Sequence, residues 1–249
     1  MNYSLAAIDP FYAACLSMSA STAHPEPSKP FYAKLPQAPK NASPVPHLTS
    51  LYHAADEAKY GDRSYPGNCG GNLIKDLLLF FRPTFVLDPM SGSGTCPDVC
   101  DELGIPCMAW DIHQGIDACD PEGFSAELVD FIWVHPPYWR MKLYSDDPRD
   151  MSRAPSLEEF LRRYRCFLRN CTQALKPGGK LAILMGDYID REVGFIPLTW
   201  HTKRLAFESG LSQACTDIIR FLHGTSSSKK VYSGKIIPTL HDVCCVFEK

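Results

Sequence analysis

A short acidic and glycine-rich segment, Asp88-Pro89-Met90-Ser91-Gly92-Ser93-Gly94-Thr95, is the first candidate for chemistry. Its glycines allow the backbone to approach a ligand closely, and the helix predicted after it offers free N–H groups. The lysine of a phosphate loop is absent, and Pro97 occupies the third glycine position of the dinucleotide pattern. A second acid, Asp111, ends the next apolar stretch, where a carboxylate can accept hydrogen bonds from ribose hydroxyls. The pattern therefore predicts a ribose-containing ligand; the alternative is a tight strand-to-helix turn without one.

The second candidate is His135-Pro136-Pro137-Tyr138, directly after an apolar stretch. Two prolines cannot continue a strand, and they fix an extended backbone that holds His135 and Tyr138 in place. An enzyme that modifies an exocyclic base amine needs acceptors for the amine hydrogens and an aromatic face for the extruded base. The tetrapeptide fits that chemistry; the alternative is an ordinary strand exit with a packed tyrosine.

The elements that must position these segments alternate between strand and helix signals from about residue 70. Helices are predicted over 72–81, from 95 to 103, 156–175 and 197–209, and strands over 84–88, 107–110, 128–134, 181–186, 214–222 and 243–247. Such alternation predicts a doubly wound α/β domain whose parallel sheet is covered on both faces. In this fold ligands bind beyond the carboxyl ends of the strands, where both candidate segments lie.

Composition separates an amino-terminal arm from the rest of the chain. Residues 1–46 carry eight of the 21 prolines, which predicts an irregular arm before a catalytic domain over 47–249. The net charge of −3 excludes wholesale coating of a polyanion. Residues 200–235, however, hold six Lys and Arg against two Asp and Glu, a local charge of +4 that leaves −7 elsewhere. Within them, residues 223–235 are predicted to form a basic loop that contacts nucleic-acid phosphates.

The 11 cysteines lie largely in apolar stretches, which favours reduced core thiols over a disulfide framework. Cys96 and Cys100 come closest to a metal-binding spacing, and no metal site is expected. The amino terminus makes a poor signal peptide, and no run of about 18 apolar residues is present, so a cytoplasmic protein without a membrane span is expected.

Residues 87–95 followed by residues 135–138 resemble the amino-methyltransferases that modify adenine N6 or cytosine N4 in DNA. The first segment is similar to that family's S-adenosylmethionine motif, and the second resembles its (Asp/Asn/Ser)-Pro-Pro-(Tyr/Phe/Trp) catalytic motif. Residues 65–72, 181–187 and 237–249 are also similar to family segments, so the resemblance covers about 60–249 and leaves the arm outside.

The resemblance implies a Rossmann-like methyltransferase sheet, mostly parallel, with an antiparallel strand at the carboxyl-terminal end. It implies an enzyme of bacterial or phage type that transfers methyl directly to a flipped DNA base, leaving S-adenosylhomocysteine, with adenine N6 favoured over cytosine N4. Tyr138 would stack on the base and the Pro136 carbonyl would accept from its amine. The residues that match the catalytic motif are His135, Pro136, Pro137 and Tyr138. Those that match cofactor-binding positions are Asn68 at the methionine group, Asp88, Pro89, Ser91, Gly92, Gly94, Thr95, Asp111 at the ribose, and Asp117 at the adenine amine.

His135 departs from the family pattern. Imidazole accepts a hydrogen bond only when neutral, with an unperturbed pKa near 6.5, so activity is expected to fall as the pH drops through that pKa. The departure leaves open an inactive cofactor-binding or DNA-binding homologue. An RNA amino-methyltransferase is the nearest enzymatic alternative, and a protein-glutamine methyltransferase a weaker one. The expected nucleic-acid contacts are Arg140, Lys142, Tyr144, Lys229, Lys230 and Lys235, and the sequence gives no oligomeric state.

Overall fold

The computed structural model describes residues 40–53, 59–221 and 237–249. Most of the predicted proline-rich arm and all of the predicted basic loop, residues 223–235, lie outside the described residues. Of the arm, residues 40–46 are described, and they form turns and bends without helix or strand. No described helix is both long enough and apolar enough to cross a lipid bilayer.

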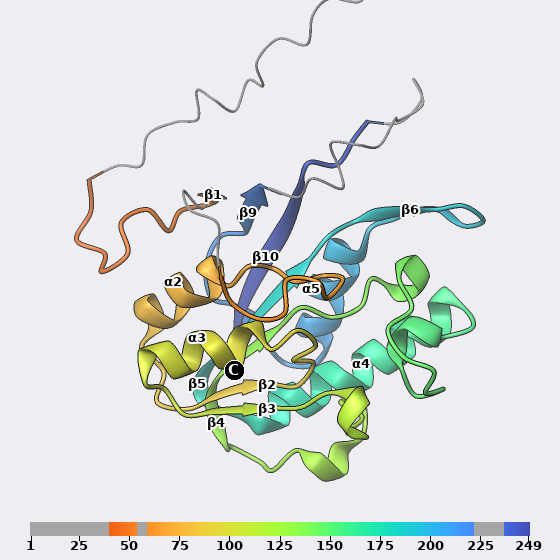
Figure 1. The fold of residues 1–249 in the computed structure, drawn as a ribbon, viewed down its shortest axis with the longest axis horizontal. Coiled ribbons are helices and arrows are strands. Elements are labelled where there is room, and N and C mark those ends of the chain that lie inside the picture. The colour runs from red at the N-terminus through yellow and green to blue at the C-terminus, as the bar shows by residue number, and fades with distance from the viewer. Residues whose placement is uncertain (1–39, 54–58, 222–236) are drawn as a thin grey trace, which may run out of the picture. The chain divides into compact units, whose positions relative to one another are not determined.

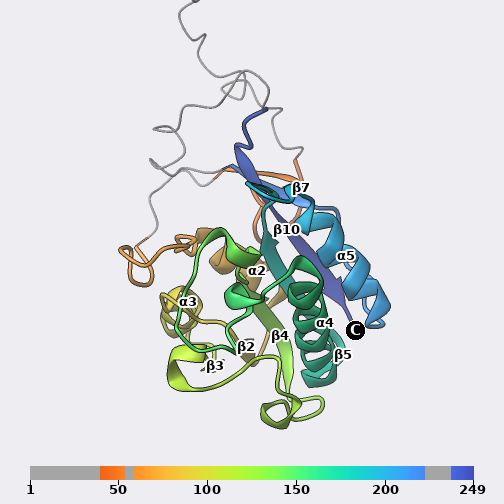
Figure 2. The same cartoon turned by 90° about the vertical axis from the view of Figure 1, so that its right-hand side faces the viewer.

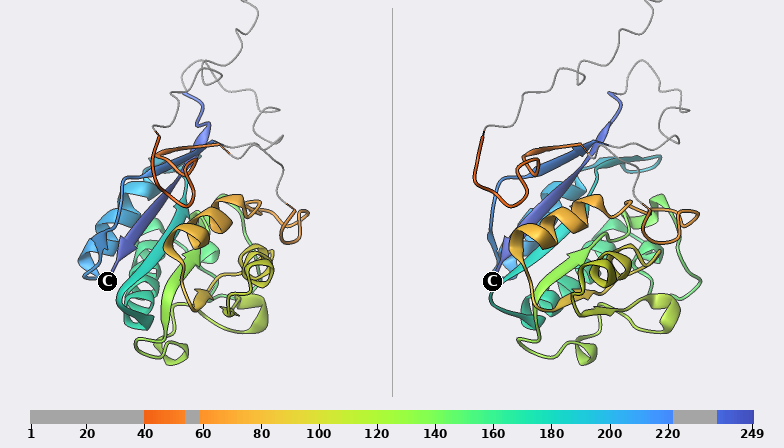
Figure 3. Two further views of the ribbon diagram at one scale, coloured as in Figure 1. Left: turned by 90° about the vertical axis from the view of Figure 1, so that its left-hand side faces the viewer. Right: turned by 60° about the vertical axis from the view of Figure 1, so that its left-hand side comes forward.

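A mostly parallel sheet forms the centre of the described fold (Figure 1). Its strands lie in the order β1 (Leu51–Tyr52), β9 (Ile218–Phe221), β10 (His241–Glu248), β5 (Leu175–Met185), β4 (Val129–Val134), β2 (Val86–Asp88) and β3 (Cys107–Ala109), with β8 (Ser212–Gln213) also paired to β10. The β5, β4, β2 and β3 neighbours are parallel, whereas β10 is antiparallel to both β5 and β9. Figure 3 shows β10 beside β5. The doubly wound sheet predicted from the sequence, with an antiparallel strand near its carboxyl-terminal end, is therefore confirmed.

Within the described residues, four α-helices cover the two faces of the sheet. In Figure 2, α2 (Asn72–Phe81) and α3 (Thr95–Leu103) lie on one face, and α4 (Leu157–Ala174) and α5 (Leu198–Glu208) lie on the other. The Ser156 hydroxyl accepts from the Glu159 N–H and starts α4, as its capping sequence predicts. Gly104 ends α3 with φ +66°, a conformation that favours glycine. Short 3₁₀ helices follow the strand ends, at Ile112–Gln114, Pro121–Gly123, Trp139–Met141 and Met151–Arg153.

The central strands are apolar on both faces because each face has its own core. On β4, Phe131 and Trp133 pack in the core under α2 and α3, whereas Ile132 and Val134 pack in the core under α4 and α5. The same alternation places Cys244 and Cys245 of β10 in different cores. Since successive side chains of a strand point to opposite faces, continuous apolar runs are the signature of a sheet covered on both sides.

Two differences from the sequence prediction concern the strands after α4. Residues 176–179 were expected to separate the helix from its strand, but β5 begins at Leu175, directly after the helix. A hairpin of β6 (Tyr188–Asp190) and β7 (Gly194–Ile196) stands between β5 and α5, where no strand was predicted. Each strand of the hairpin has three residues, and the exposed positions carry the apolar Ile189 and Phe195, so the sequence does not alternate between apolar and polar residues as a half-buried strand does.

Candidate functional site

A pocket opens at the carboxyl ends of β2, β3 and β4. The chain continues from β2 to β3 on one side and returns to β4 on the other, so the pocket lies at the point where strand order reverses. It holds about 820 Å³ of space between protein atoms, its open mouth included. Ten of the predicted site residues line it, namely Asp88, Pro89, Ser91, Gly92, Thr95, Asp111, Asp117, His135, Pro137 and Tyr144.

The turn after β2 forms one wall and is tied to the end of β3. The Gly92 N–H donates to Asp111 Oδ2 over 2.8 Å, and the Ser91 N–H donates to the Trp110 carbonyl, also over 2.8 Å. Gly92 has φ +42°, and a Cβ built there would lie 3.0 Å from the Tyr65 ring, so the position requires glycine. The turn therefore presents its backbone and short side chains to the pocket.

Three of the carboxylates that line the pocket were predicted as cofactor contacts. Asp88 is only 3% exposed, its Oδ1 accepts from the Met90 N–H over 3.2 Å, and burial raises its pKa well above the usual range. Asp111 Oδ1 accepts from the His113 N–H and Asp117 Oδ1 from the Cys119 N–H. Each carboxylate oxygen has two lone pairs, so all three groups can accept further hydrogen bonds from a ligand.

The apolar part of the wall comes from the segment after β3 and from the loop after the Pro-Pro motif. Ile112, Ile116, Ala118 and Met151 line the pocket beside Asp111 and Asp117. Sequence reasoning missed these residues because isolated apolar side chains in loops carry no periodic signal.

Two tyrosines lie against each other at the pocket. The rings of Tyr65 and Tyr144 stack with centroids 5.9 Å apart and planes 22° apart, and both line the pocket. Burial raises the pKa of Tyr65 to about 12. Arg149, also on the wall, pairs with Asp147 over 2.6 Å and reaches the Gly115 carbonyl. Tyr144, predicted as a nucleic-acid contact, is therefore part of the pocket wall.

The Pro-Pro motif places His135 and Tyr138 in mutual contact. His135 Nε2 lies 3.0 Å from the Tyr138 hydroxyl, and the imidazole also hydrogen-bonds the backbone of Gly67. The Gly67 contact raises the pKa of His135, which is the effect of a backbone acceptor on an imidazole N–H. In neutral imidazole the other nitrogen, Nε2, is then the acceptor for the Tyr138 hydroxyl.

Burial lowers the pKa of His135 to about 4, with Asp242 opposing and Arg220 adding to the shift. The sequence-based expectation placed the acid loss of activity near pH 6.5, the ordinary value for histidine. The structure moves the titration of this side chain to a more acidic range, because the partly buried ring loses part of its hydration. His135 is therefore neutral at pH 7.

Tyr138 itself does not line the pocket. A Cβ built at Gly186 would lie 2.8 Å from the Tyr138 ring, so the ring packs directly on the backbone after β5. Pro136 is buried, and Pro137 lines the pocket in its place. The stacking role for Tyr138 and the acceptor role for the Pro136 carbonyl stay predictions.

Two residues predicted to contact the cofactor, Asn68 and Gly94, do not line the pocket. The Asn68 amide donates to the carbonyls of Tyr60 and Asp62, both over 3.0 Å, and its oxygen accepts from the Gly70 N–H. Asn68 thus organises the loop while its neighbours Gly67 and Cys69 line the pocket. Gly94 is the residue before α3, with φ +78°, and it does not line the pocket either.

A buried ion pair behind the motif escaped the sequence analysis. Arg220 of β9 binds Asp242 of β10 through Nε and Nη2, over 2.9 and 2.6 Å, and its Nη1 donates to the Cys69 carbonyl over 2.9 Å. The two side chains are 16% and 6% exposed. The pair thereby fastens the loop at Cys69 to the sheet, and its charges act on both His135 and Tyr138.

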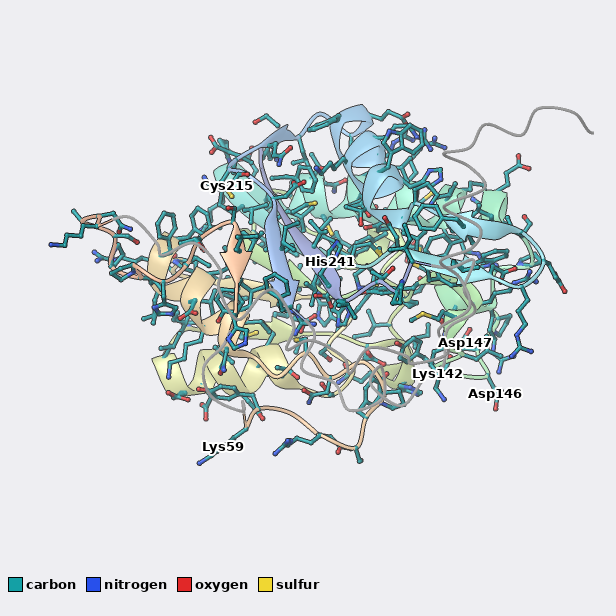
Figure 4. All side chains as sticks on the ribbon, turned by 90° about the horizontal axis from the view of Figure 1, so that it is seen from above. Lys59, Lys142, Asp146, Asp147, Cys215 and His241 are labelled. Atoms are coloured by element: carbon teal, nitrogen blue, oxygen red, sulfur yellow. The ribbon has the colours of Figure 1, made fainter. Side chains whose placement is uncertain are left out.

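The predicted nucleic-acid contacts fare differently. Arg140 pairs with acidic groups of the β6–β7 hairpin, with Asp190 at 2.8 Å and Glu192 at 2.6 Å, and its contact with nucleic acid stays a prediction. Lys142 is exposed, at the same edge of the structure as Asp146 and Asp147 (Figure 4). Lys229, Lys230 and Lys235 lie outside the described residues.

Comparison with known proteins finds similar solved structures. No protein-family model and no curated protein match the chain. A Thermus thermophilus protein assigned as a DNA modification methylase shares 24% identity over 54% of this chain and 52% of its own, with a TM-score of 0.41. TrmN from Thermus thermophilus shares 21% sequence identity over 67% of this chain and 44% of its own, with a TM-score of 0.41. The PvuII cytosine-N4-specific DNA methyltransferase shares 18% sequence identity over 53% of this chain and 47% of its own, with a TM-score of 0.40.

This chain spans about half the length of each of these three structures. At such identities and TM-scores, the chemistry of the site has to be judged from its own residues.

Proposed function

We propose that this chain is an S-adenosylmethionine-dependent methyltransferase that acts on an exocyclic amine of a DNA base. The proposal rests on one observation: two motifs 40 residues apart, the Asp88–Thr95 turn and the His135–Tyr138 segment, meet around one pocket at the switch point of the sheet. Nucleotide-like ligands bind at such switch points.

The residues of the pocket fit this cofactor. It needs acceptors for ribose hydroxyls and for an adenine amine, an apolar slot for the ring, and negative charge near its cationic end. Asp111 and Asp117 supply the acceptors, Ile112, Ile116 and Ala118 supply the apolar wall, and the buried Asp88 supplies the charge. When bound, S-adenosylmethionine supplies a methyl group on a positively charged sulfur. A cation favours the ionised form of Asp88, which burial alone disfavours.

On the substrate side, the rigid Pro-Pro backbone keeps an edge of the pocket in place for a base. The Pro136 carbonyl is the proposed acceptor for the amine hydrogens. His135 accepts a hydrogen bond from the Tyr138 hydroxyl. We therefore propose it as a positioning residue that fixes the Tyr138 ring, and not as the acceptor for the amine of the base. Adenine N6 is the favoured target over cytosine N4. The proposal includes a cytoplasmic location in a bacterial or phage-infected cell, where such DNA would be accessible.

The test is transfer of labelled methyl from S-adenosylmethionine to unmethylated DNA and, in parallel, to total RNA, followed by nucleoside analysis. We expect N6-methyladenine or N4-methylcytosine in DNA. Asp111→Ala should abolish transfer, whereas Asp101→Ala, on the exposed part of α3, should leave it unchanged. Label in RNA alone would replace DNA by RNA as the substrate. Cofactor binding without transfer to either would indicate an inactive homologue, and absence of cofactor binding would overturn the proposal.

A further inference from the structure

Three cysteine side chains converge behind the wall of the pocket. The sulfur atoms of Cys96, Cys100 and Cys107 all lie within 4.8 Å of one another. Cys96 and Cys100 are fully buried, and Cys107 is half-buried. Among the described residues, this is the sole group of three or more His, Cys, Asp or Glu side chains whose ligand atoms come together this closely.

The local fold explains the convergence. Cys96 and Cys100 are four residues apart in α3, which puts them on one face of the helix. The helix ends at Gly104, and the Ile105 N–H donates to the Cys100 carbonyl over 2.9 Å, so the chain turns back immediately beneath that face. Cys107 is then the first residue of β3. The sequence spacing alone indicated that Cys96 and Cys100 lie close together, and the turn after α3 brings Cys107 beside them.

The chemistry of three thiols is that of a soft metal ligand set. Thiolate sulfur selects Zn²⁺ and other thiophilic ions over hard cations. A Zn–S bond of about 2.3 Å places tetrahedral ligand sulfurs roughly 3.8 Å apart, so the three sulfurs need to approach one another by no more than about 1 Å. Cys107 is half-buried, so one of the three thiols is partly accessible to solvent.

The burial of the cluster bears on the kind of ion that it can hold. Cys96 and Cys100 are fully buried, and thiolates are costly to bury without a counter-charge. A divalent ion would supply that counter-charge, and the three converging sulfurs would share it.

We propose that Cys96, Cys100 and Cys107 form a binding site for one thiophilic ion of the Zn²⁺ class. The site does not depend on the proposed methyl transfer. It adjoins the pocket through the chain, because Thr95 precedes Cys96 and lines the pocket, and Asp111 follows β3 by two residues. A bound ion therefore cross-links the helix and the strand that carry this wall.

The experiment uses the whole reduced chain and Cd²⁺ as a spectroscopic probe, followed by Zn²⁺. We expect thiolate-to-cadmium charge-transfer absorption that saturates at one ion per chain, and a rise of several degrees in the unfolding temperature with either ion. Cys100→Ser and Cys107→Ser should each lose the tight binding. Cys171→Ser, a matched change of a buried thiol in the other core, should keep it.

A second measurement keeps the test independent of whether a variant folds. Alkylation of the wild-type protein, with peptide mapping, should show that Cd²⁺ protects the half-buried Cys107 and leaves the exposed Cys215 reactive. Cys215 lies away from the centre of the structure in Figure 4. Equal alkylation of Cys107 with and without the ion would overturn the proposal, as would one-ion stoichiometry that persists in Cys107→Ser.

Discussion

The two sides of the pocket are built in different ways. The side formed by the turn after β2 and by Asp111 is held by hydrogen bonds between neighbouring strand ends, such as Gly92 N–H to Asp111. The side formed by His135 and Pro137 is held by a loop that Arg220 fastens from the far part of the sheet. Short-range geometry specifies the first side, and one buried ion pair between β9 and β10 supports the second.

The difference teaches where each side is vulnerable. Changes in the first side should act locally on ligand affinity, because its residues contact the pocket directly. Substitutions in the Arg220–Asp242 pair, which supports the second side, should lower the stability of the whole domain as well as disturb the site. The pair belongs to the sheet and also holds the Cys69 loop. Four measurements test this contrast.

The largest effect is expected from Arg220→Met. Removal of one partner leaves Asp242 buried without its counter-charge, which costs about 3–5 kcal/mol of unfolding free energy. Urea unfolding measures the loss. The double variant Arg220→Met with Asp242→Leu should recover much of it, because no unpaired charge remains. A loss below about 1 kcal/mol in the single variant would show that the pair does not support this side.

A smaller and more local effect is expected from Asp111→Ala. The variant removes an acceptor for the ligand and leaves the Gly92 N–H without its partner. A loss of about 2–3 kcal/mol, roughly 30- to 150-fold in affinity, should appear in calorimetric titration with S-adenosylhomocysteine. Stability should change far less than in Arg220→Met. Asp120→Ala, which removes an exposed cap outside the pocket, is the control and should bind normally.

The pH dependence of stability tests the second side without a ligand. The folded pKa of His135 is about 4, below its unfolded value, so the unfolded state binds more protons between those values. The contribution of His135 is therefore complete above about pH 6.5 and is lost as the pH falls toward 4.

Between pH 7 and pH 5 the wild type should lose about 2 kcal/mol of unfolding free energy through this residue. His135→Asn should lack that part of the loss, because asparagine does not titrate. Denaturant unfolding at both pH values measures the difference. Parallel pH curves for the two proteins would contradict the assigned burial of the imidazole.

The smallest effect separates Arg140 from Lys142 in nucleic-acid binding. Arg140 is already paired with Asp190 and Glu192, so Arg140→Ala should leave the salt dependence of DNA affinity unchanged. Lys142→Ala removes an exposed charge and should lower the slope of log affinity against log salt by about 1. Fluorescence anisotropy across a salt series measures both. A lower slope for Arg140→Ala than for Lys142→Ala would reverse the assignment.

Much of the fold could be predicted because its signals are local. The helix predicted over 72–81 matches α2, and the Ser156 cap starts α4 as its sequence indicates. Likewise, Asp88 and Asp111 end neighbouring strands, so the rules of parallel sheets alone bring them to one pocket. These features depend on the periodicity of apolar residues, on local capping sequences and on the order of the strands.

What could not be predicted depends on tertiary contacts between residues distant in sequence. Arg220 and Asp242 carry no spacing signal because their partnership is made by the antiparallel pairing of β9 and β10. The pKa of His135 depends on the loop that encloses it, and the engagement of Arg140 depends on a hairpin about 50 residues away. Each is a property of the assembled sheet.

The position of β10 bears on how this chain folds as it is synthesised. It is made after every other described strand, yet it lies between β5 and β9 and contributes side chains to both cores. Until it emerges from the ribosome, β5 presents an unpaired edge, and such edges are templates for aggregation. Neither core can close before residues 241–248 are available, so folding of the sheet is completed only after its last described strand has been made.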